Sequence, residues 1–85
     1  MESCDTRSKA EKVRRVLGIQ NRNDLAVAVI HDALYWSLPD DDRRIWDQFL
    51  KGLEVYEISI VLDMSWNQVE KTVEAIRALL GAKLR

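Results

Sequence analysis

Apolar residues recur along this chain at intervals of three and four, which is the spacing of one face of an α-helix. Near the start this spacing covers residues 10–17, and Gly18 follows as a helix terminator. Ser8 and Glu11 form the pattern of a capping box, in which side chains satisfy backbone amides at the start of a helix. We therefore predict a first helix from Ser8 to Gly18, preceded by a flexible tail over residues 1–7.

The second predicted helix is unusual because apolar residues lie nearly all round it. The polar run 20–23 predicts a turn, and Asn23 can cap a helix that runs from Asp24 to about Ser37. Beyond its first residue, the clearly polar positions are few: His31, Asp32 and Ser37. Such a helix is either the central core helix or partly an interface.

The third predicted helix follows a break at Leu38-Pro39, because proline disfavours helical geometry in the residue before it and has no amide hydrogen to donate. Three aspartates at 40–42 open this helix, and we interpret them as capping and dipole compensation, not as a metal or catalytic cluster. Its apolar face covers residues 45–50, and Gly52 ends it.

Two further helices are separated by only a few residues. Apolar positions over 55–62 predict a short helix, followed by a tight connection at Asp63 and Met64. Ser65 caps the last helix, which we expect Gly81 to close. The chain shows no strand alternation, so we predict an all-α fold: one domain over residues 1–85, built as a small bundle of four to five helices.

Composition and charge narrow the class of protein. With 47% hydrophobic and 32% charged residues, the chain has the composition of a globular domain and is too apolar for a disordered tail. No apolar run reaches the length of a membrane span, and the opening Met-Glu-Ser-Cys-Asp is too polar for a signal peptide. We therefore expect a cytoplasmic protein with no membrane partner.

Candidate catalytic and metal-binding residues are scarce. One cysteine, Cys4, and one histidine, His31, form neither a disulfide framework nor a metal site unless other ligands help. His31 and Asp32 are adjacent, hence about 100° apart on a helix, so we do not expect them to form a dyad. Without a phosphate-binding glycine loop or a nucleophile with a companion base, we expect no enzyme, no catalytic residue, no metal and no cofactor.

The segment from Leu38 to Leu80 carries a motif that spans several elements. It has a Leu-Pro opening, a helix start that is acidic and then bears arginines, an aliphatic-aromatic helix, and a short scaffold helix. The scaffold Glu-Ile-Ser-Ile-Val-Leu at 57–62 is similar to the Glu-Ile-Ala-x-Ile-Leu of sigma factor region 4, and Asp-Met-Ser at 63–65 is similar to its turn. The resemblance covers roughly half of the chain without a gap. It implies a bacterial transcription regulator with a DNA-binding helix-turn-helix over residues 38–85, after N-terminal helices over 8–37.

The resemblance also implies a site. The helix from Ser65 to Leu80 becomes the recognition helix, whose buried stripe packs Val69 and Val73 against the scaffold helix. Its exposed face then meets double-stranded DNA, where amides and a lysine can read base edges and arginines can contact the backbone. The expected DNA-binding residues are Trp66, Asn67, Gln68, Glu70, Lys71, Glu74, Arg43 and Arg44.

Departures from the family pattern favour a second hypothesis. The formal net charge is −1, and Lys71 is the only cation in the first two turns of the recognition helix, beside Glu70 and Glu74. Ile60 and Trp66 are apolar where an exposed polar residue is usual, so they are the expected partner interface. The alternative is a protein-interaction module that does not bind DNA and docks on RNA polymerase subunits or another regulator. A structural domain of unknown role is a third alternative.

Two expectations concern assembly and core. The apolar second helix and the thin core of so short a chain lead us to expect a homodimer. Such a dimer would bind paired half-sites on DNA and so double an electrostatic contact that is weak in one copy. Of the three tryptophans, Trp46 and then Trp36 are the candidates for the core, whereas Trp66 is the one expected to be partly exposed.

Overall fold

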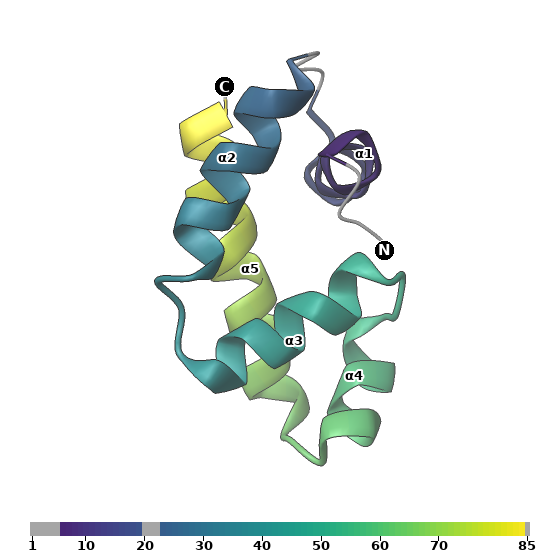
Figure 1. Cartoon of the computed structure of the whole chain (residues 1–85). Coiled ribbons are helices and arrows are strands. Elements are labelled where there is room, and N and C mark those ends of the chain that lie inside the picture. The colour runs from purple at the N-terminus through teal and green to yellow at the C-terminus, as the bar shows by residue number, and fades with distance from the viewer. Residues whose placement is uncertain (1–5, 20–22, 85) are drawn as a thin grey trace.

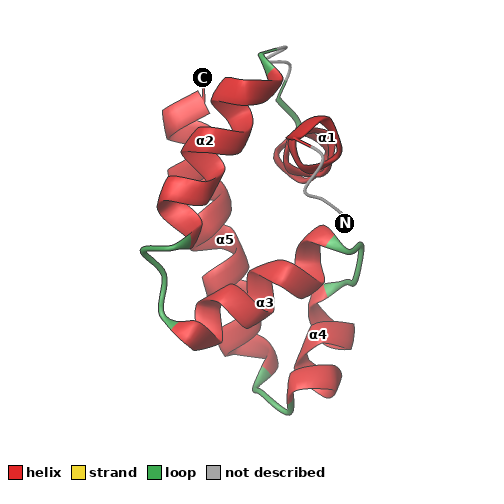
Figure 2. Ribbon diagram, viewed as in Figure 1, coloured by secondary structure: helices red, strands yellow, loops and turns green. Residues whose placement is uncertain are grey.

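The protein is described by a computed structural model over residues 6–19 and 23–84, with side chains from residue 8. These residues form helices joined by short connections and contain no strand (Figure 2), so the predicted all-α fold is confirmed. The five helices of the described chain are α1 (Thr6–Leu17), α2 (Asp24–Tyr35), α3 (Asp40–Leu50), α4 (Val55–Leu62) and α5 (Trp66–Leu84).

The longest helix, α5, runs through the whole bundle (Figure 1). The second half of α5 lies beside α2. α3 crosses the first half of α5, and α4 also packs against it. The first helix, seen nearly end-on in Figure 1, packs mainly on α2 and also contacts α3 and α5. The N-terminal helices therefore cover one end of α5, and the helix-turn-helix occupies the other.

Two clusters of buried side chains form the core, and α5 contributes to both. Ile76, Leu80 and Leu84 join residues of α1 and α2 around the fully buried Trp46. Val69 and Val73 pack with Ile45 of α3 and Ile58 of α4. Burying an aliphatic side chain of this size stabilises a fold by roughly 1.5–3 kcal/mol. Both halves of the molecule therefore depend on one apolar stripe along α5.

Polar side chains fix the beginning of three helices. The Ala26 amide donates to Asn23 Oδ1 over 3.1 Å, which confirms the predicted cap of α2. At the start of α5, the Gln68 amide donates to Ser65 Oγ over 3.2 Å, as predicted. At α4 the Glu54 amide donates to Glu57 Oε1 over 2.8 Å, an N-terminal contact that was not predicted from the sequence.

The ends of three helices differ from the sequence prediction. α1 begins at Thr6, so Ser8 lies inside the helix and the predicted cap and the end of the predicted tail are wrong. Residues 6 and 7 are neither glycine nor proline, so nothing in the sequence prevents the helix from beginning before Ser8. Residues 1–5, with Cys4, and positions 20–22 of the turn predicted over 20–23 lie outside the described residues.

The other two differences follow from a local turn after α2 and from core packing at the end of α5. α2 ends at Tyr35 and not near Ser37, because the next residues form a tighter turn in which the Ser37 amide donates to the Leu34 carbonyl over 3.0 Å. α5 continues through Gly81 to Leu84, which is buried in the core. Burial of Leu84 offsets the cost of about 1 kcal/mol for a glycine inside a helix.

Candidate nucleic-acid interface

The segment α4–turn–α5 has the connection that a helix-turn-helix requires. Asp63 adopts a left-handed conformation, with φ of 55°, and so ends α4. The Met64 amide donates back to the Ser59 carbonyl over 3.0 Å, which closes the turn. Ile58 and the half-buried Leu62 pack against Val69 and Val73, as predicted. With this side of α5 buried, its opposite side is left to solvent.

Six residues of the predicted DNA contact lie on that open side of α5. All are exposed, and no other described element covers them. The polar side chains among them make no hydrogen bond or ion pair with the described part of the chain. They are therefore available to a partner as one surface over the first turns of the helix. These residues are Trp66, Asn67, Gln68, Glu70, Lys71 and Glu74.

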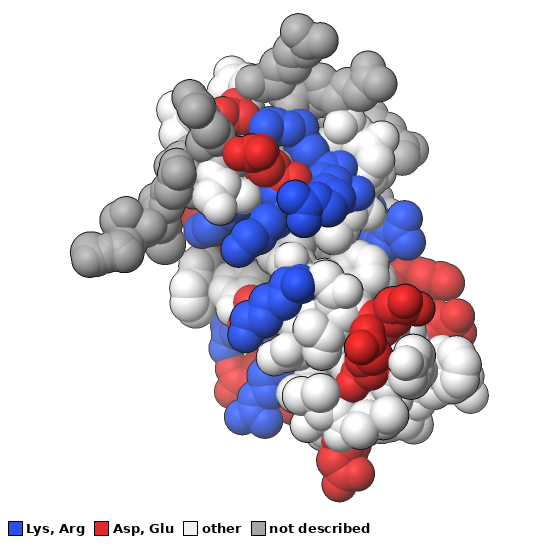
Figure 3. All heavy atoms as spheres, turned by 90° about the vertical axis from the view of Figure 1, so that its right-hand side faces the viewer, with Lys and Arg blue, Asp and Glu red and all other residues white. Residues whose placement is uncertain are grey.

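The charge of this surface is negative, because Lys71 is flanked by Glu70 and Glu74. A face of this charge attracts phosphate weakly and depends on amide and lysine contacts to bases for its affinity. Across the side of the molecule drawn in Figure 3, basic side chains form a band along one part of the surface and acidic side chains gather beside it. On this side of the molecule, the basic band and the acidic side chains therefore occupy separate parts of the surface.

The two arginines predicted to contact the DNA backbone have separate surroundings. Arg43 pairs with Asp40, and its guanidinium carbon lies 5.4 Å from the ring centroid of Trp36. Arg44 is exposed and lines a cleft to which α5 contributes no residue. Arg43 therefore has a structural role within the described chain, and Arg44 belongs to a different surface from the α5 face.

Apolar residues expose a patch on the same helix-turn-helix. Ile60 and Trp66, the predicted partner interface, are 72% and 59% exposed. Tyr56 and Val61 of α4 are also mostly exposed. Tyr56 was not among the predicted interface residues, although Tyr56 and Ile60 are four residues apart and share one side of a helix.

α2 has one buried and one exposed apolar side. Val27 and Ala28 are buried, as is His31, whereas Leu25 and Val29 are exposed on the other side. Trp36 is 69% exposed, so its expected place in the core is wrong. The reason is that α2 ends just before Trp36, and the indole lies beside Arg43 at the start of α3.

His31 lies at the centre of a polar network inside the bundle. Trp46 Nε1, which can only donate, gives a hydrogen bond to His31 Nε2 over 2.9 Å, so Nε2 carries no proton. The neutral ring then holds its proton on Nδ1, which lies 3.1 Å from Asp32 Oδ1. Lys9 Nζ lies 3.0 Å from the same carboxylate. We expected no dyad of His31 and Asp32, but the Asp32 carboxylate lies within hydrogen-bond distance of the His31 ring and also pairs with Lys9 of α1.

Burial and hydrogen bonding set the pKa values in this network. Burial lowers the pKa of His31 below 6.5, despite the opposing effect of the Asp32 carboxylate. Burial alone raises the pKa of Asp32, but hydrogen bonds from Lys9 and His31 outweigh it, and the pKa falls below 3.8. Burial and the hydrogen bond to Asp47 raise the pKa of Tyr35. His31 is therefore neutral and Asp32 charged near neutral pH.

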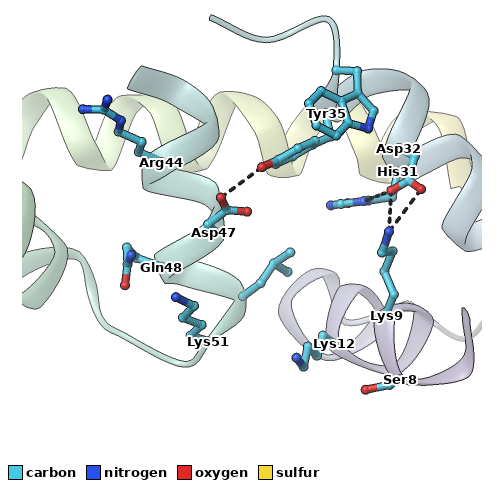
Figure 4. Close-up of a pocket in the computed structure, with 12 residues that line it drawn as sticks. Ser8, Lys9, Lys12, His31, Asp32, Tyr35, Arg44, Asp47, Gln48 and Lys51 are labelled. Atoms are coloured by element: carbon cyan, nitrogen blue, oxygen red, sulfur yellow. Dashed lines mark hydrogen bonds and ion pairs between the residues drawn. The ribbon is translucent and has the colours of Figure 1, made fainter. Parts of the chain in front are cut away.

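A cleft of about 550 Å³ opens between α1, α2 and α3, and sequence reasoning did not predict it (Figure 4). Four basic side chains line it, two from α1 and two from α3 and its C-terminal end. Their spacing within each helix is visible in the sequence, but the sequence does not state which helices face each other. The basic lining consists of Lys9, Lys12, Arg44 and Lys51.

Comparison of the chain with protein-family models, curated proteins and solved structures finds no match. The resemblance to sigma factor region 4 therefore stays a hypothesis that rests on residues 38–80. Among the helices that the structure describes, none has the length and apolar character needed to cross a membrane.

Proposed function

We propose that this protein is a transcription regulator that binds double-stranded DNA by placing the start of α5 in the major groove. One observation carries the proposal: the first turns of α5 are uncovered, while the helix is held from behind by α3 and α4. A recognition helix needs this combination of rigid support and an open face. The resemblance to sigma factor region 4 favours the same function.

The side chains of this face define how bases would be read. Asn67 and Gln68 can pair with the edge of adenine through their amides, and Lys71 can donate to guanine or to a phosphate. Glu70 and Glu74 can accept from the amino group of cytosine and repel nearby phosphates. The resulting affinity rests on base contacts more than on charge, so it is modest for random DNA and higher for a matching site.

A second copy of the chain is the expected partner of α2. Leu25 and Val29 are exposed one helical turn apart on a side that no described helix covers. A two-fold axis would place this stripe against itself and present two recognition helices to paired half-sites. In sedimentation equilibrium, we expect a dimer that Val29→Lys converts to a monomer; a wild-type chain that stays monomeric at high concentration removes this part of the proposal.

An amide NMR titration with mixed-sequence duplex DNA tests the proposed function. At low salt we expect shifts concentrated over residues 67–75 that weaken as salt is raised. Asn67→Ala should reduce the α5 shifts, whereas Arg77→Ala, an exposed cation further along the same helix, should leave them nearly unchanged. The absence of α5 shifts at low salt would contradict the proposal.

The exposed apolar patch favours a second candidate function, a protein-interaction module. Tyr56, Ile60, Val61 and Trp66 together offer aromatic and aliphatic surface of the kind that fills partner pockets. RNA polymerase subunits or another regulator are the partners to try. Under this hypothesis Trp66→Ala abolishes binding to a purified subunit and Lys71→Ala does not, which is the reverse of the pattern expected for DNA.

A further inference from the structure

The cleft between α1, α2 and α3 brings cations together from opposite walls. Lys9 and Lys12 are three residues apart on α1, so they lie on the same side of that helix. Arg44 of α3 and Lys51, at its C-cap, line the facing wall. In Figure 4, Lys9 and Lys12 lie on α1, and Asp47 and Gln48 lie between Arg44 and Lys51 along the other wall, where the Arg44 guanidinium points away from α1.

Half of this positive charge is not compensated by acidic side chains of the cleft. Lys9 is paired with Asp32, and Asp47 accepts a hydrogen bond from Tyr35 over 2.9 Å. Four basic and two acidic side chains line the cleft, which leaves an excess of two positive charges. The basic side chains other than Lys9 are exposed and make no ion pair with any described residue. An excess of cations along one concave surface raises the local positive potential and attracts anions.

One wall of the same cleft is aromatic. Tyr35 and Trp36 line it, with their ring centroids 5.0 Å apart in an edge-to-face arrangement. Trp36 leaves most of its surface to solvent, which is unusual for so large an apolar ring. An exposed indole beside a set of cations is suited to a ligand that has both a planar ring and an anionic group.

We propose that this cleft binds a small phosphorylated ligand with a planar ring, of the nucleoside phosphate class. Ammonium and guanidinium groups are the side chains that proteins use to bind phosphate, and Lys12, Arg44 and Lys51 supply both kinds. The volume of about 550 Å³ lies within the range of small-ligand sites. Because no residue of α5 lines the cleft, this inference is independent of the proposed DNA contact.

Titration with defined probes tests the proposal. Isothermal calorimetry and amide NMR at low salt would compare ATP, pyrophosphate, adenosine and a short DNA duplex. We expect saturable binding of ATP with shifts at the cleft, weaker binding of pyrophosphate, and the weakest binding of adenosine. Lys12→Ala and Lys51→Ala should each weaken ATP binding by roughly tenfold, since each removes a contact to a charged group.

Two further variants make the test specific. Trp36→Leu should weaken ATP binding and leave pyrophosphate binding unchanged, because it removes the ring contact alone. Lys71→Ala, an exposed cation on α5, should leave ATP binding unchanged. Circular dichroism of each variant establishes that it folds.

Three results would overturn the inference. One is the absence of saturable ATP or pyrophosphate binding, and another is an equal loss of ATP affinity in Lys71→Ala. The third is cleft shifts with the duplex but not with ATP, which would assign the cations to a DNA backbone. Duplex shifts confined to α5 bear on the proposed function and leave this inference standing.

Discussion

At the residue scale, His31 shows how neighbours select one protonation state of a buried side chain. Its Nε2 accepts from Trp46, and its Nδ1 faces the Asp32 carboxylate that Lys9 also holds. Protonation of Nε2 would break the hydrogen bond from the buried indole. The ring therefore stays neutral in the fold at a pH where an exposed histidine takes up a proton.

This arrangement predicts a pH dependence of stability. The folded pKa of His31 lies below the unfolded value of 6.5, so between the two values the unfolded chain binds more protons. The free energy of unfolding should therefore fall as pH drops below 6.5, by at most about 1.4 kcal/mol per pH unit from this group. Asp32, whose folded pKa is also lowered, adds a loss of the same sign below 3.8.

Urea denaturation followed by tryptophan fluorescence, at pH values between about 5 and 7, measures this slope. His31→Gln is the matched variant, because it keeps a polar side chain and does not titrate. The variant should lose the slope in that range, whatever its stability at neutral pH. An unchanged slope in His31→Gln would assign the effect to other groups.

Asp63 is a second residue whose local geometry has a measurable consequence. It is the one non-glycine residue with positive φ in the described chain, and it ends α4 in the turn before α5. Aspartate tolerates this conformation better than a β-branched residue does. We expect Asp63→Val to lower the free energy of unfolding by about 1–2 kcal/mol and Asp63→Gly to stay within about 0.5 kcal/mol of wild type. Chemical denaturation of the two variants checks this, and equal losses would show that the left-handed turn does not matter.

At the element scale, the last turn of α5 depends on one buried side chain. Leu84 is only 6% exposed, whereas Leu79 of the same helix is 49% exposed. Leu84→Ala should lower the free energy of unfolding by about 2–3 kcal/mol, near the lower end of buried leucine truncations. Leu79→Ala is the control and should cost much less. Thermal unfolding would separate them, and similar losses would argue that α5 ends at Gly81.

The helices themselves were predictable from the sequence, whereas several of their ends were not. The three-and-four spacing and the polar caps Asn23 and Ser65 are local signals, and they located the beginnings of α2 and α5 correctly. The extension to Leu84 and the exposure of Trp36 depend on what lies across the bundle, which no local pattern encodes.

Of the candidate sites, the one formed by a single helix was predictable from the sequence and the one formed between helices was not. The open face of α5 was predictable, because it is the side opposite a buried stripe on one helix. The basic cleft was not, because Lys12 and Lys51 belong to helices whose relative placement is set by the core around Trp46. Side chains that meet across elements are the features for which a structure is needed.

At the scale of the whole molecule, the two core clusters are joined through α5, so the chain should unfold as one unit. The fragment 38–85 contains the complete helix-turn-helix but lacks Val13, Leu17 and Val27, which cover the second half of α5. Without these partners, Ile76 and Leu80 face water. We therefore expect the fragment to lose most of its helix content and its cooperative transition.

Circular dichroism and thermal unfolding of the fragment, beside a chain that lacks only residues 1–5, make this comparison. The shorter deletion spares every residue of the two core clusters in the described part of the chain, so it should keep a cooperative transition near that of the full chain. A fragment 38–85 that unfolded cooperatively at the same temperature would make the helix-turn-helix an independent domain. The N-terminal helices would then be needed only to form the cleft, because Lys9 and Lys12 of α1 and Asp32 of α2 line it and Lys9 pairs with Asp32.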